Sequence, residues 1–235
     1  MQDYTSPLKV HYRTRYDDLP RKDLVELITE PPGSVLELGC GAGATGALVK
    51  QRFGDVRYVG IELDHGAAAI ARRRLDEVIV ANIEQVDLKE HGLAKESFDL
   101  IICGDVLEHL YDPWKALYLL RDYLKPQGKL LASIPNTQNI GVILHLLNGN
   151  WTYMEHGLLD ATHIRFFTLR EIDKLFSGTG YEIVSCNCIL QRQIESDGWP
   201  RDLEFGRLVI KNVSMEEAKL FYTFQYLVTA RRKIL

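Results

Sequence analysis

The amino-acid sequence predicts a doubly wound α/β fold: a mostly parallel, seven-stranded sheet with an antiparallel last strand and helices on both faces. Two observations predict it. Short apolar runs alternate with segments of helical pattern up to Pro135, and a glycine-rich turn follows the first of these runs. The 235 residues, 46% of them hydrophobic, are enough to bury one substantial core. Because no linker or internal repeat divides the chain, we expect a single domain over residues 1–235.

Five strands and three helices are predicted before Pro135. The apolar runs of strand length are residues 34–39, 57–62, 77–81, 98–104 and 129–134. The helical segments between them are residues 44–53, 64–74 and 113–123. Asp64 suits the N-cap of the second helix, and Pro113 suits the first turn of the third. The fourth apolar run, FDLIICG, is nearly continuous, which is typical of a strand that is buried on both faces.

After Pro135 the alternation is interrupted, and we predict an insert at about residues 136–167. It contains the apolar, helix-like stretch IGVILHLL. Two interpretations stay open: this helix packs on the domain, or the insert forms a lid over a site, because long interruptions of compact domains often carry function. Thr168 and Glu171 have the spacing of a capping box, so the next helix is expected to begin there.

The remaining chain predicts two more strands and one more helix. Residues 181–190 form an apolar run of strand length, whereas residues 191–204 are polar and loop-like. Ser214 and Glu217 again have capping-box spacing. The run FQYLVTARR, residues 224–232, predicts the last strand. No crossover helix lies cleanly between the two last strands, so we expect the last one to insert antiparallel.

Composition excludes several classes of protein. The net charge of −4 disfavours nucleic-acid binding, and the basic runs at 72–74 and 231–233 are short enough to be solvated faces. The cysteines form no C-x-x-C pair, and the N-terminal segment has no signal-peptide pattern, so we expect a cytoplasmic protein with reduced thiols. The cysteines are Cys40, Cys103, Cys186 and Cys188. No apolar run approaches the roughly 18 residues that span a bilayer.

The stretch VLELGCGAGATG, residues 35–46, has the Gly41-x-Gly43-x-x-Gly46 spacing of a dinucleotide-binding fingerprint. Glycines after a strand let the backbone approach a ligand closely, and the following helix offers N–H groups at the carboxyl edge of the sheet. Glu62 ends the second predicted strand 21 residues after Gly41, where an acidic residue accepts ribose hydroxyls. Several nucleotide cofactors share this pattern, and a nicotinamide cofactor is one of them.

Further motifs follow in order, and together they distinguish between these cofactors. Glu37 lies inside the first strand, where a dehydrogenase normally keeps an apolar residue. The later motifs are VGIEL, ANIEQVDL, FDLIICGDVLEHLYDP, LKPQGKLLASIPN and FFTLREIDKLFSGTGYEI. With these motifs the chain resembles the class I S-adenosylmethionine-dependent methyltransferases over roughly residues 32–190 and in the final YLVTARR run. The run DATHIRFFTLREI resembles bacterial members that act on small molecules or are associated with glycans.

The resemblance implies a Rossmann-like methyltransferase fold and S-adenosylmethionine as the cofactor. It implies that Glu37 organises the glycine loop, that Glu62 accepts hydrogen bonds from both ribose hydroxyls, and that Leu63 packs on adenine. The other matched positions contact the methionine, the ribose or the adenine. They are Gly39, Cys40, Gly41, Asn82, Ile83, Cys103, Gly104 and Asp105. The family often has Asp where Asn82 stands, and an amide oxygen can still accept a hydrogen bond there.

Methyl transfer to a hydroxyl needs an aligned acceptor and a base that removes its proton. Histidine is the usual base near neutral pH. We expect His163, and after it His156, to be the catalytic residues, because the insert leaves the fifth strand at the same edge as the glycine loop. An interior, hydrogen-bonded histidine is the alternative for both. Tyr12 and Arg15, in the polar N-terminal segment, are candidates for closing over the cofactor.

A metal-dependent variant is the alternative to this interpretation. The run Asp105-x-x-Glu108-His109 resembles the Glu-x-x-Glu-His pattern of methyltransferases that hold a divalent ion, and His163 would add a further ligand. Carboxylate and imidazole ligands together suit Mn²⁺ or Zn²⁺ better than Mg²⁺. Asp105 replaces the first glutamate of that pattern, however, and the same run is common in relatives that show no metal. The sequence therefore favours a site without metal.

The expected acceptor is a hydroxyl of a sugar, another small polar metabolite or a glycan, because the insert combines Trp151 and Tyr153 with polar side chains. Two alternatives belong to other classes. One is a nicotinamide-dependent oxidoreductase. Tyr111 and Lys115 have the spacing of the short-chain dehydrogenase pair, but they stand too early in the chain and lack its other motifs. The other alternative is a methyltransferase-like module that binds the cofactor without turnover.

Overall fold

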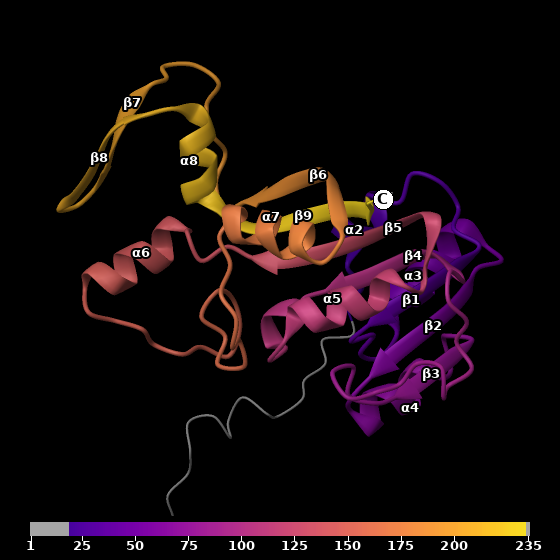
Figure 1. Ribbon diagram of the computed structural model, residues 1–235. Coiled ribbons are helices and arrows are strands. Elements are labelled where there is room, and N and C mark those ends of the chain that lie inside the picture. Colours follow the sequence, from indigo (N-terminus) through magenta and orange to yellow (C-terminus); the bar gives the residue numbers. More distant parts are fainter. Residues whose placement is uncertain (1–18, 234–235) are drawn as a thin grey trace, which may run out of the picture.

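A computed structural model describes residues 19–233 of the chain. Its main sheet has seven strands in the order β3-β2-β1-β4-β5-β9-β6, and β7 and β8 form a separate two-stranded hairpin (Figure 1). The strands are β1 Ser34–Leu38, β2 Arg57–Glu62, β3 Glu77–Val80, β4 Phe98–Gly104, β5 Leu124–Pro135, β6 Tyr181–Leu190, β7 Arg201–Phe205, β8 Leu208–Val213 and β9 Thr223–Arg232. The helices are α2 Lys22–Glu26, α3 Ala44–Phe53, α4 His65–Ala71, the 3-10 turn η1 Leu107–His109, α5 Pro113–Arg121, α6 Ile140–Leu147, α7 Leu169–Gly178 and α8 Met215–Tyr222.

Strand direction in the main sheet follows the prediction from the sequence. The first five strands pair parallel in the order β3-β2-β1-β4-β5. Strand β9 lies between β5 and β6 and is antiparallel to both. The predicted antiparallel insertion of the last strand is therefore confirmed. Because the parallel strands all run the same way, the glycine turn after β1 and the ends of β2, β4 and β5 meet at one edge.

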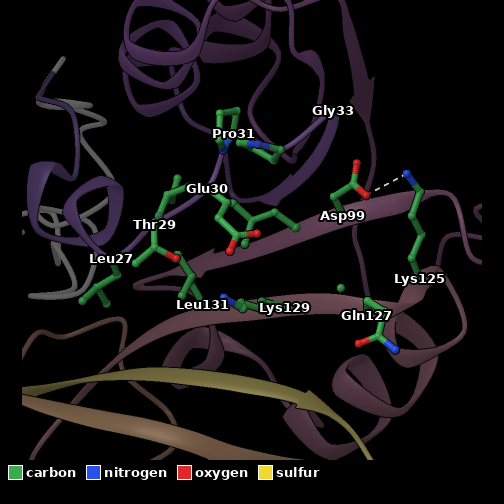
Figure 2. A pocket seen from close by; sticks show the side chains of 14 residues that line it. Leu27, Thr29, Glu30, Pro31, Gly33, Asp99, Lys125, Gln127, Lys129 and Leu131 are labelled. Atoms are coloured by element: carbon green, nitrogen blue, oxygen red, sulfur yellow. Dashed lines mark hydrogen bonds and ion pairs between the residues drawn. The ribbon is translucent and has the colours of Figure 1, made fainter.

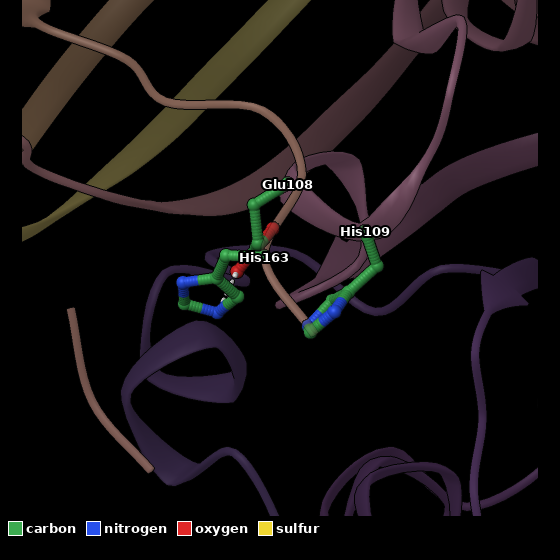
Figure 3. A group of neighbouring side chains, drawn as sticks. All are labelled: Glu108, His109 and His163. Carbon is green, nitrogen blue, oxygen red and sulfur yellow. Dashed lines mark ion pairs between the residues drawn. The ribbon is translucent and has the colours of Figure 1, made fainter. Parts of the chain in front are cut away.

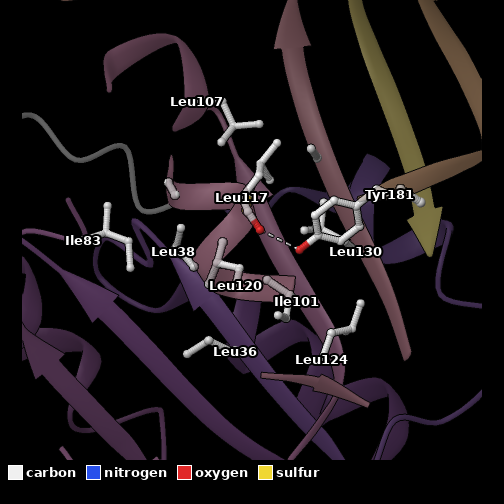
Figure 4. Packing of buried hydrophobic residues seen from close by; sticks show 14 of the residues in the cluster. Leu36, Leu38, Ile83, Ile101, Leu107, Leu117, Leu120, Leu124, Leu130 and Tyr181 are labelled. Atoms are coloured by element: carbon white, nitrogen blue, oxygen red, sulfur yellow. Dashed lines mark hydrogen bonds between the residues drawn. The ribbon is translucent and has the colours of Figure 1, made fainter. Parts of the chain in front are cut away.

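Alternating side chains of the strands enter two separate cores, one on each face of the sheet. On β4, for example, Ile101 belongs to the larger cluster and Ile102 to the smaller one. Helices α5 and α7 cover the larger cluster, whereas α2 and α3 contribute to the smaller one. Figure 4 shows part of the larger cluster, where the Tyr181 hydroxyl donates to the carbonyl of Leu117 at 3.0 Å. Burial on both faces explains the nearly continuous apolar run of β4.

The insert and the last third of the chain build a smaller core of their own at one end of the sheet. Ile140 of α6 packs there with buried residues of the hairpin and of α8, namely Leu203, Val213, Ala218 and Tyr222. In Figure 1 this group lies at the end of the molecule opposite β2 and β3. The hairpin corrects our prediction, because residues 191–204 were expected to be loop and β7 begins at Arg201. The hydrophobic pattern of β7 in the sequence is weak, because Leu203 is the one buried residue of this strand.

Helix starts and the fifth strand provide smaller tests of the sequence analysis. The Asp64 carboxylate accepts from the Ala67 amide at 2.7 Å, as an N-cap should, and Ser214 forms the predicted capping box. The capping box predicted at Thr168 is not formed. Helix α7 begins directly after Thr168, but the Thr168 side chain makes no capping hydrogen bond. The fifth strand begins at Leu124 and not at residue 129, with an irregular register opposite the start of β4.

Two further expectations concern composition. All four cysteines are free thiols. No helix within residues 19–233 is long and apolar enough to cross a membrane.

Candidate functional site

The loop between β1 and α3 has the backbone conformation that its glycines permit. Gly39, Gly41 and Gly43 have φ angles of 61°, 53° and 79°, in the left-handed region where side chains are disfavoured. A Cβ atom on Gly39 would also lie 2.5 Å from the Cγ2 atom of Val106. Gly43 is the N-cap of α3, and no side chain caps that helix, so its first-turn amides are not satisfied by a cap. The loop therefore presents bare backbone at the carboxyl edge of the sheet.

Glu62 ties the end of β2 to this loop. Its Oε2 atom accepts from the Gly41 amide at 2.8 Å, and its Oε1 atom accepts from the Asp64 amide at 2.8 Å. The side chain is buried. Next to it, Leu63 is 66% exposed, which is unusual for a leucine between a strand and a helix of the core. A fixed carboxylate beside an exposed apolar side chain suits a nucleoside, whose ribose needs acceptors and whose base needs an apolar face.

Glu37 lies on β1 beneath the loop and is fully enclosed. The Tyr58 hydroxyl donates to its Oε2 atom at 2.8 Å. Burial raises the pKa of Glu37 to about 8, and the nearby Glu62 carboxylate adds to that rise. Cys40 is buried as well, and burial raises the pKa of its thiol far above the ordinary value. Only the backbone of Cys40 is therefore suited to contact a ligand.

The adenine-side positions follow β3. The side-chain oxygen of Asn82 accepts from the Glu84 amide at 2.9 Å, which shapes the turn after the strand. Ile83 is buried and belongs to the larger core. Its amide and the amide side chain of Asn82 remain at the same sheet edge as Glu62, because β2 and β3 are parallel and adjacent.

At the end of β4 the three predicted positions differ in what they offer. The side chain of Cys103 is completely buried in the core, so only its backbone belongs to the edge. A Cβ atom on Gly104 would lie 3.0 Å from the Cδ1 atom of Leu24, so α2 packs directly over this glycine. Asp105 has a positive φ of 53° and is the first residue beyond the strand. The strained backbone places its side chain over the edge.

Asp105 is held by a network that the sequence analysis missed. Its carboxylate pairs with the Arg21 guanidinium, accepts from the Gln225 amide, and accepts from the Ser133 hydroxyl at 3.0 Å. Arg21 also donates to the Ser133 hydroxyl at 2.8 Å and pairs with Asp23 at 2.8 Å. These residues come from the start of α2, where Arg21 is the N-cap, and from β5 and β9, far apart in the chain. No local spacing in the sequence marks them as neighbours.

A cavity opens beside Asp105, and the insert supplies one of its walls. Its polar lining comes from the end of β4, from η1, from the insert and from β9: Asp105, Glu108, His109, His156, Asp160, His163 and Gln225. The insert is anchored on η1 by two hydrogen bonds, because the amides of Ile164 and Arg165 both donate to the Glu108 carbonyl, at 2.9 and 3.0 Å. The carboxyl edge therefore carries a polar cavity as well as the glycine loop.

The two predicted catalytic histidines occupy different environments in this cavity. His156 is exposed. His163 is only 8% exposed; its Nδ1 atom lies 3.4 Å from the Leu158 carbonyl oxygen and its Nε2 atom lies 4.0 Å from Oε1 of Glu108. Burial, and after it the neighbouring His109, lower the pKa of His163. One ring nitrogen thus faces backbone, as in a structural histidine, while the other faces a carboxylate in the cavity.

Glu108 is the most unusual group at this edge. It is 1% exposed, and neither of its carboxylate oxygens has a hydrogen-bond partner among the described residues. Burial, and after it the charge of Asp105, raise the pKa of Glu108 well above its ordinary value. Figure 3 shows Glu108 and His109 on η1 with His163 facing them from the insert. Glu108, His109 and His163 each offer an atom that can bind a metal ion, so the three side chains form a candidate metal centre.

A second cavity lies at the opposite, amino edge of the sheet (Figure 2). Its lining comes from the segment before β1 and from the starts of β4 and β5, and it includes Glu30, Lys129 and an ion pair of 2.8 Å between Lys125 and Asp99. Ligands of open α/β sheets bind at the carboxyl edge. We therefore place the candidate site beside the glycine loop and not here.

Two pairs of residues singled out in the sequence are not part of this site as described. Tyr111, the first member of the dehydrogenase-like pair, is 74% exposed, and Lys115 lies in the first turn of α5, where its amide donates to the side chain of the N-cap Asp112 at 2.9 Å. This spacing is thus part of a helix start. Tyr12 and Arg15 lie outside the described residues.

The residues present fit S-adenosylmethionine. A side chain at Gly39 would collide with Val106, so the loop offers bare backbone; Glu62 offers a fixed acidic acceptor, and Leu63 offers an exposed apolar surface. Asp105, its hydrogen-bonding partners and the cavity lie at the same sheet edge as this cradle of residues. The nearby carboxylates also suit the positive sulfonium group.

Comparisons with known proteins point the same way. A curated relative named trans-aconitate 2-methyltransferase, from Deinococcus radiodurans, is 33% identical over 63% of this chain and 51% of its own length. A ubiquinone biosynthesis O-methyltransferase from Acinetobacter baylyi is 30% identical over 43% of each chain. The chain thus spans about half the length, or less, of these curated relatives. A solved structure from Thermotoga maritima, titled as an S-adenosylmethionine-dependent methyltransferase and possible histamine N-methyltransferase, has a TM-score of 0.59 at 20% identity. That match covers 90% of this chain and 87% of the other, and it shows a shared fold.

A family model described as a methyltransferase domain matches residues 11–186, three quarters of the chain. This range includes β1 to β4, the glycine loop, the insert and both catalytic candidates. The chain therefore belongs to the methyltransferase domain family, and S-adenosylmethionine is the cofactor that this membership implies.

Proposed function

We propose that this protein is an S-adenosylmethionine-dependent methyltransferase that moves a methyl group to a hydroxyl of a small polar acceptor, such as a sugar or another metabolite. One observation carries the proposal. The glycine loop with its fixed Glu62 and the polar cavity beside Asp105 share one edge of the sheet. Donor and acceptor can thus be held side by side, as an in-line displacement requires.

The proposed cofactor site uses the residues of the cradle. Glu62 accepts from the ribose hydroxyls, Leu63 packs on adenine, and Asn82 with Ile83 contacts the adenine amino group. The backbone of the glycine loop, organised by Glu37 from below, lies against the methionine and the ribose, as does the segment from Cys103 to Asp105. Its positions are Gly39, Cys40 and Gly41. When bound, S-adenosylmethionine supplies a methyl group on a positively charged sulfur, which is the electrophile of the reaction.

The chain itself must hold the acceptor and remove its proton. His156 is exposed in the cavity, so its imidazole can approach an acceptor hydroxyl within the 2.6–3.2 Å that proton transfer needs. His163 is buried and faces Glu108, which favours a positioning role over the role of base that the sequence analysis gave it first. We therefore assign the role of base, which removes the acceptor proton, to His156. His163 is assigned a positioning role in the wall of the cavity.

The nature of the acceptor is supported by the cavity and by a named relative. The lining is rich in carboxylate and imidazole groups, which suit a polar acceptor with several hydroxyls. The insert also contains Trp151, which packs edge to face with Phe166 at 5.3 Å, and the exposed Tyr153, so it offers aromatic faces of the kind that suit a sugar ring. The Acinetobacter relative is named as an O-methyltransferase. A glycan terminus is one form such an acceptor can take.

Two measurements test the proposal. Calorimetric titration with S-adenosylhomocysteine should give one site per chain, whereas NAD should give none; the reverse result would identify a nicotinamide protein. Labelled S-adenosylmethionine should then transfer its methyl group to members of a panel of sugars, catechols and hydroxy acids. Binding without transfer to any hydroxyl compound would favour the module that keeps the fold without turnover.

A further inference from the structure

Three side chains with metal-ligand atoms meet where the insert crosses η1. Glu108, His109 and His163 each offer one such atom, and these atoms all lie within 4.8 Å of one another. The rings of the two histidines pack edge to face with centroids 4.8 Å apart. Figure 3 shows that the three side chains converge from two separate segments of the chain. The three side chains are therefore near enough to one another to be tested as ligands of a single ion.

The carboxylate of Glu108 needs a partner that the described residues do not provide. It is 1% exposed, and both of its oxygens are without a hydrogen bond among those residues. Burying a carboxylate without a compensating charge or hydrogen bond is strongly unfavourable. The nearby Asp105 carboxylate is itself occupied by Arg21, Ser133 and Gln225. A cation between Glu108 and the histidines would supply the missing compensation.

Both histidines are oriented as metal ligands are. The Nδ1 atom of His109 lies 3.2 Å from the carbonyl oxygen of Thr162, and that of His163 lies 3.4 Å from the carbonyl oxygen of Leu158. A carbonyl oxygen only accepts, so each Nδ1 must carry the proton, and each Nε2 keeps its lone pair. Metal-binding histidines typically donate their other ring N–H in this way. Both carbonyls belong to the insert, so one segment sets both tautomers.

We propose that Glu108 and the Nε2 atoms of His109 and His163 bind one divalent transition-metal ion, of which Zn²⁺ is the best representative. Two imidazoles and one carboxylate form a set found at zinc and non-haem iron sites, and it leaves at least one position open. Mg²⁺ is disfavoured because it prefers oxygen ligands. Glu108, His109 and His163 line the cavity that also contains Asp105 and His156, so an ion held by them would border that cavity.

This site differs from the sequence-based expectation of a site without metal, and it also differs from the four-ligand pattern formed by Asp105, Glu108, His109 and His163. Asp105 is absent from the proposed ligand set because its carboxylate is committed to the Arg21 network. At its open coordination position, a bound ion would take an acceptor oxygen and lower the pKa of that hydroxyl. The existence of the site does not depend on the proposed methyl transfer.

The experiment measures metal binding directly. The full chain is stripped with EDTA, dialysed, and titrated with Zn²⁺ and with Co²⁺, with bound metal measured by mass spectrometry. The visible spectrum of bound Co²⁺ reports its ligands. The wild type should bind one ion per chain, and its melting temperature should rise with Zn²⁺ concentration. Glu108→Gln and His163→Asn should each weaken binding by more than about 100-fold, because each replaces a direct ligand by a weakly binding neutral amide, where outer-shell changes already cost 10–100-fold.

The matched control is His145→Asn, which changes an exposed histidine on α6 of the same insert. It should bind Zn²⁺ like the wild type. Wild-type protein that binds less than about a tenth of an ion per chain would overturn the proposal, as would Glu108→Gln with unchanged affinity. If either Glu108→Gln or His163→Asn fails to fold, the Zn²⁺ affinities of the other variant and of His109→Asn provide the same test. S-adenosylhomocysteine titrated into each variant separates the two hypotheses, since cofactor binding should survive the loss of the metal.

Discussion

The glycine-loop half of the molecule and the insert half reach the same sheet edge by different routes. In the first half, the Gly41 amide and the Glu62 carboxylate bond at 2.8 Å across only 21 residues, between neighbouring parallel strands. In the second half, Glu108 and His163 face each other across 55 residues, and a separate small core supports one end of the insert. The first site is thus built into the strand order, whereas the second depends on how a long segment folds back.

This difference has a chemical counterpart. Glu62 is buried but bonded to two amides, so its charge is compensated locally. Glu108 is buried without any such bond among the described residues, and its compensation has to come from outside the backbone. Strand geometry fixes the cofactor half before any ligand arrives. The acceptor half has room for an additional group, which is consistent with acceptors varying more than the cofactor on one fold.

The largest effect is expected from the acceptor half, for His156→Ala. If His156 removes the acceptor proton, turnover should fall by roughly 10²–10⁴-fold, the usual contribution of a positioned acid or base. Affinity for S-adenosylhomocysteine should stay unchanged, because the residue faces the cavity and not the loop. Steady-state kinetics with an acceptor from the panel give the first quantity, and calorimetry gives the second. His145→Ala serves as control, and turnover at the wild-type rate in His156→Ala would remove His156 from the mechanism.

The next effect concerns the cofactor half, for Glu62→Ala. Losing charge-assisted hydrogen bonds to both ribose hydroxyls should cost about 2–4 kcal/mol of cofactor binding, or roughly 30-fold to 1000-fold in affinity. The substitution also releases the amides of Gly41 and Asp64, so melting curves must accompany the calorimetric titration. Glu62→Gln keeps one acceptor oxygen, so its cofactor affinity should fall between those of the wild type and Glu62→Ala. Unchanged affinity in a folded Glu62→Ala protein would mean that the loop binds something other than this nucleoside.

A third comparison uses pH and the enclosed carboxyl group under the loop. The pKa of Glu37 is raised by burial to about 8 from an ordinary 4.5, so the folded protein keeps a proton that the unfolded chain releases. The stability carried by the protonated group is fully present below about pH 4.5 and is lost as the pH rises to about 8. Between pH 6 and 7.5 the wild type should lose about 2 kcal/mol from this source.

Glu37→Gln should remove this part of the pH dependence, because a neutral amide can still accept from the Tyr58 hydroxyl. Urea unfolding at several pH values measures the free energy of unfolding of both proteins. Parallel pH profiles for the two would show that Glu37 titrates near its ordinary pKa, and that the loop rests on an ionised carboxylate.

Sequence information was sufficient where neighbours in space are set by strand order or by local spacing. The strands of the main sheet, the Asp64 cap and the Gly41–Glu62 pair could all be predicted in this way. The Arg21–Asp105 pair could not, because it joins residues 84 apart through the packing of α2 on the edge. The β7–β8 hairpin was missed because it has little buried surface of its own and pairs only with itself.

The smallest effect separates two helix starts that look alike in the sequence. Ser214 and Glu217 form a reciprocal box at α8, with the Ser214 amide donating to the carboxylate at 2.8 Å, whereas Thr168 makes no capping bond and Glu171 bonds to Lys174 at 2.7 Å. Ser214→Ala should therefore cost about 1 kcal/mol of unfolding free energy, the typical value for a cap.

Thr168→Ala should cost less than half as much, although α7 packs on the main core and α8 on the small one. The free energy of unfolding from chemical denaturation measures both variants under the same conditions. A larger loss for Thr168→Ala would mean that position in the fold outweighs the capping bond. A loss for Ser214→Ala seen only by a probe on Trp199, with the main transition unchanged, would mean that the small core unfolds apart from the sheet, because Trp199 packs against that small core.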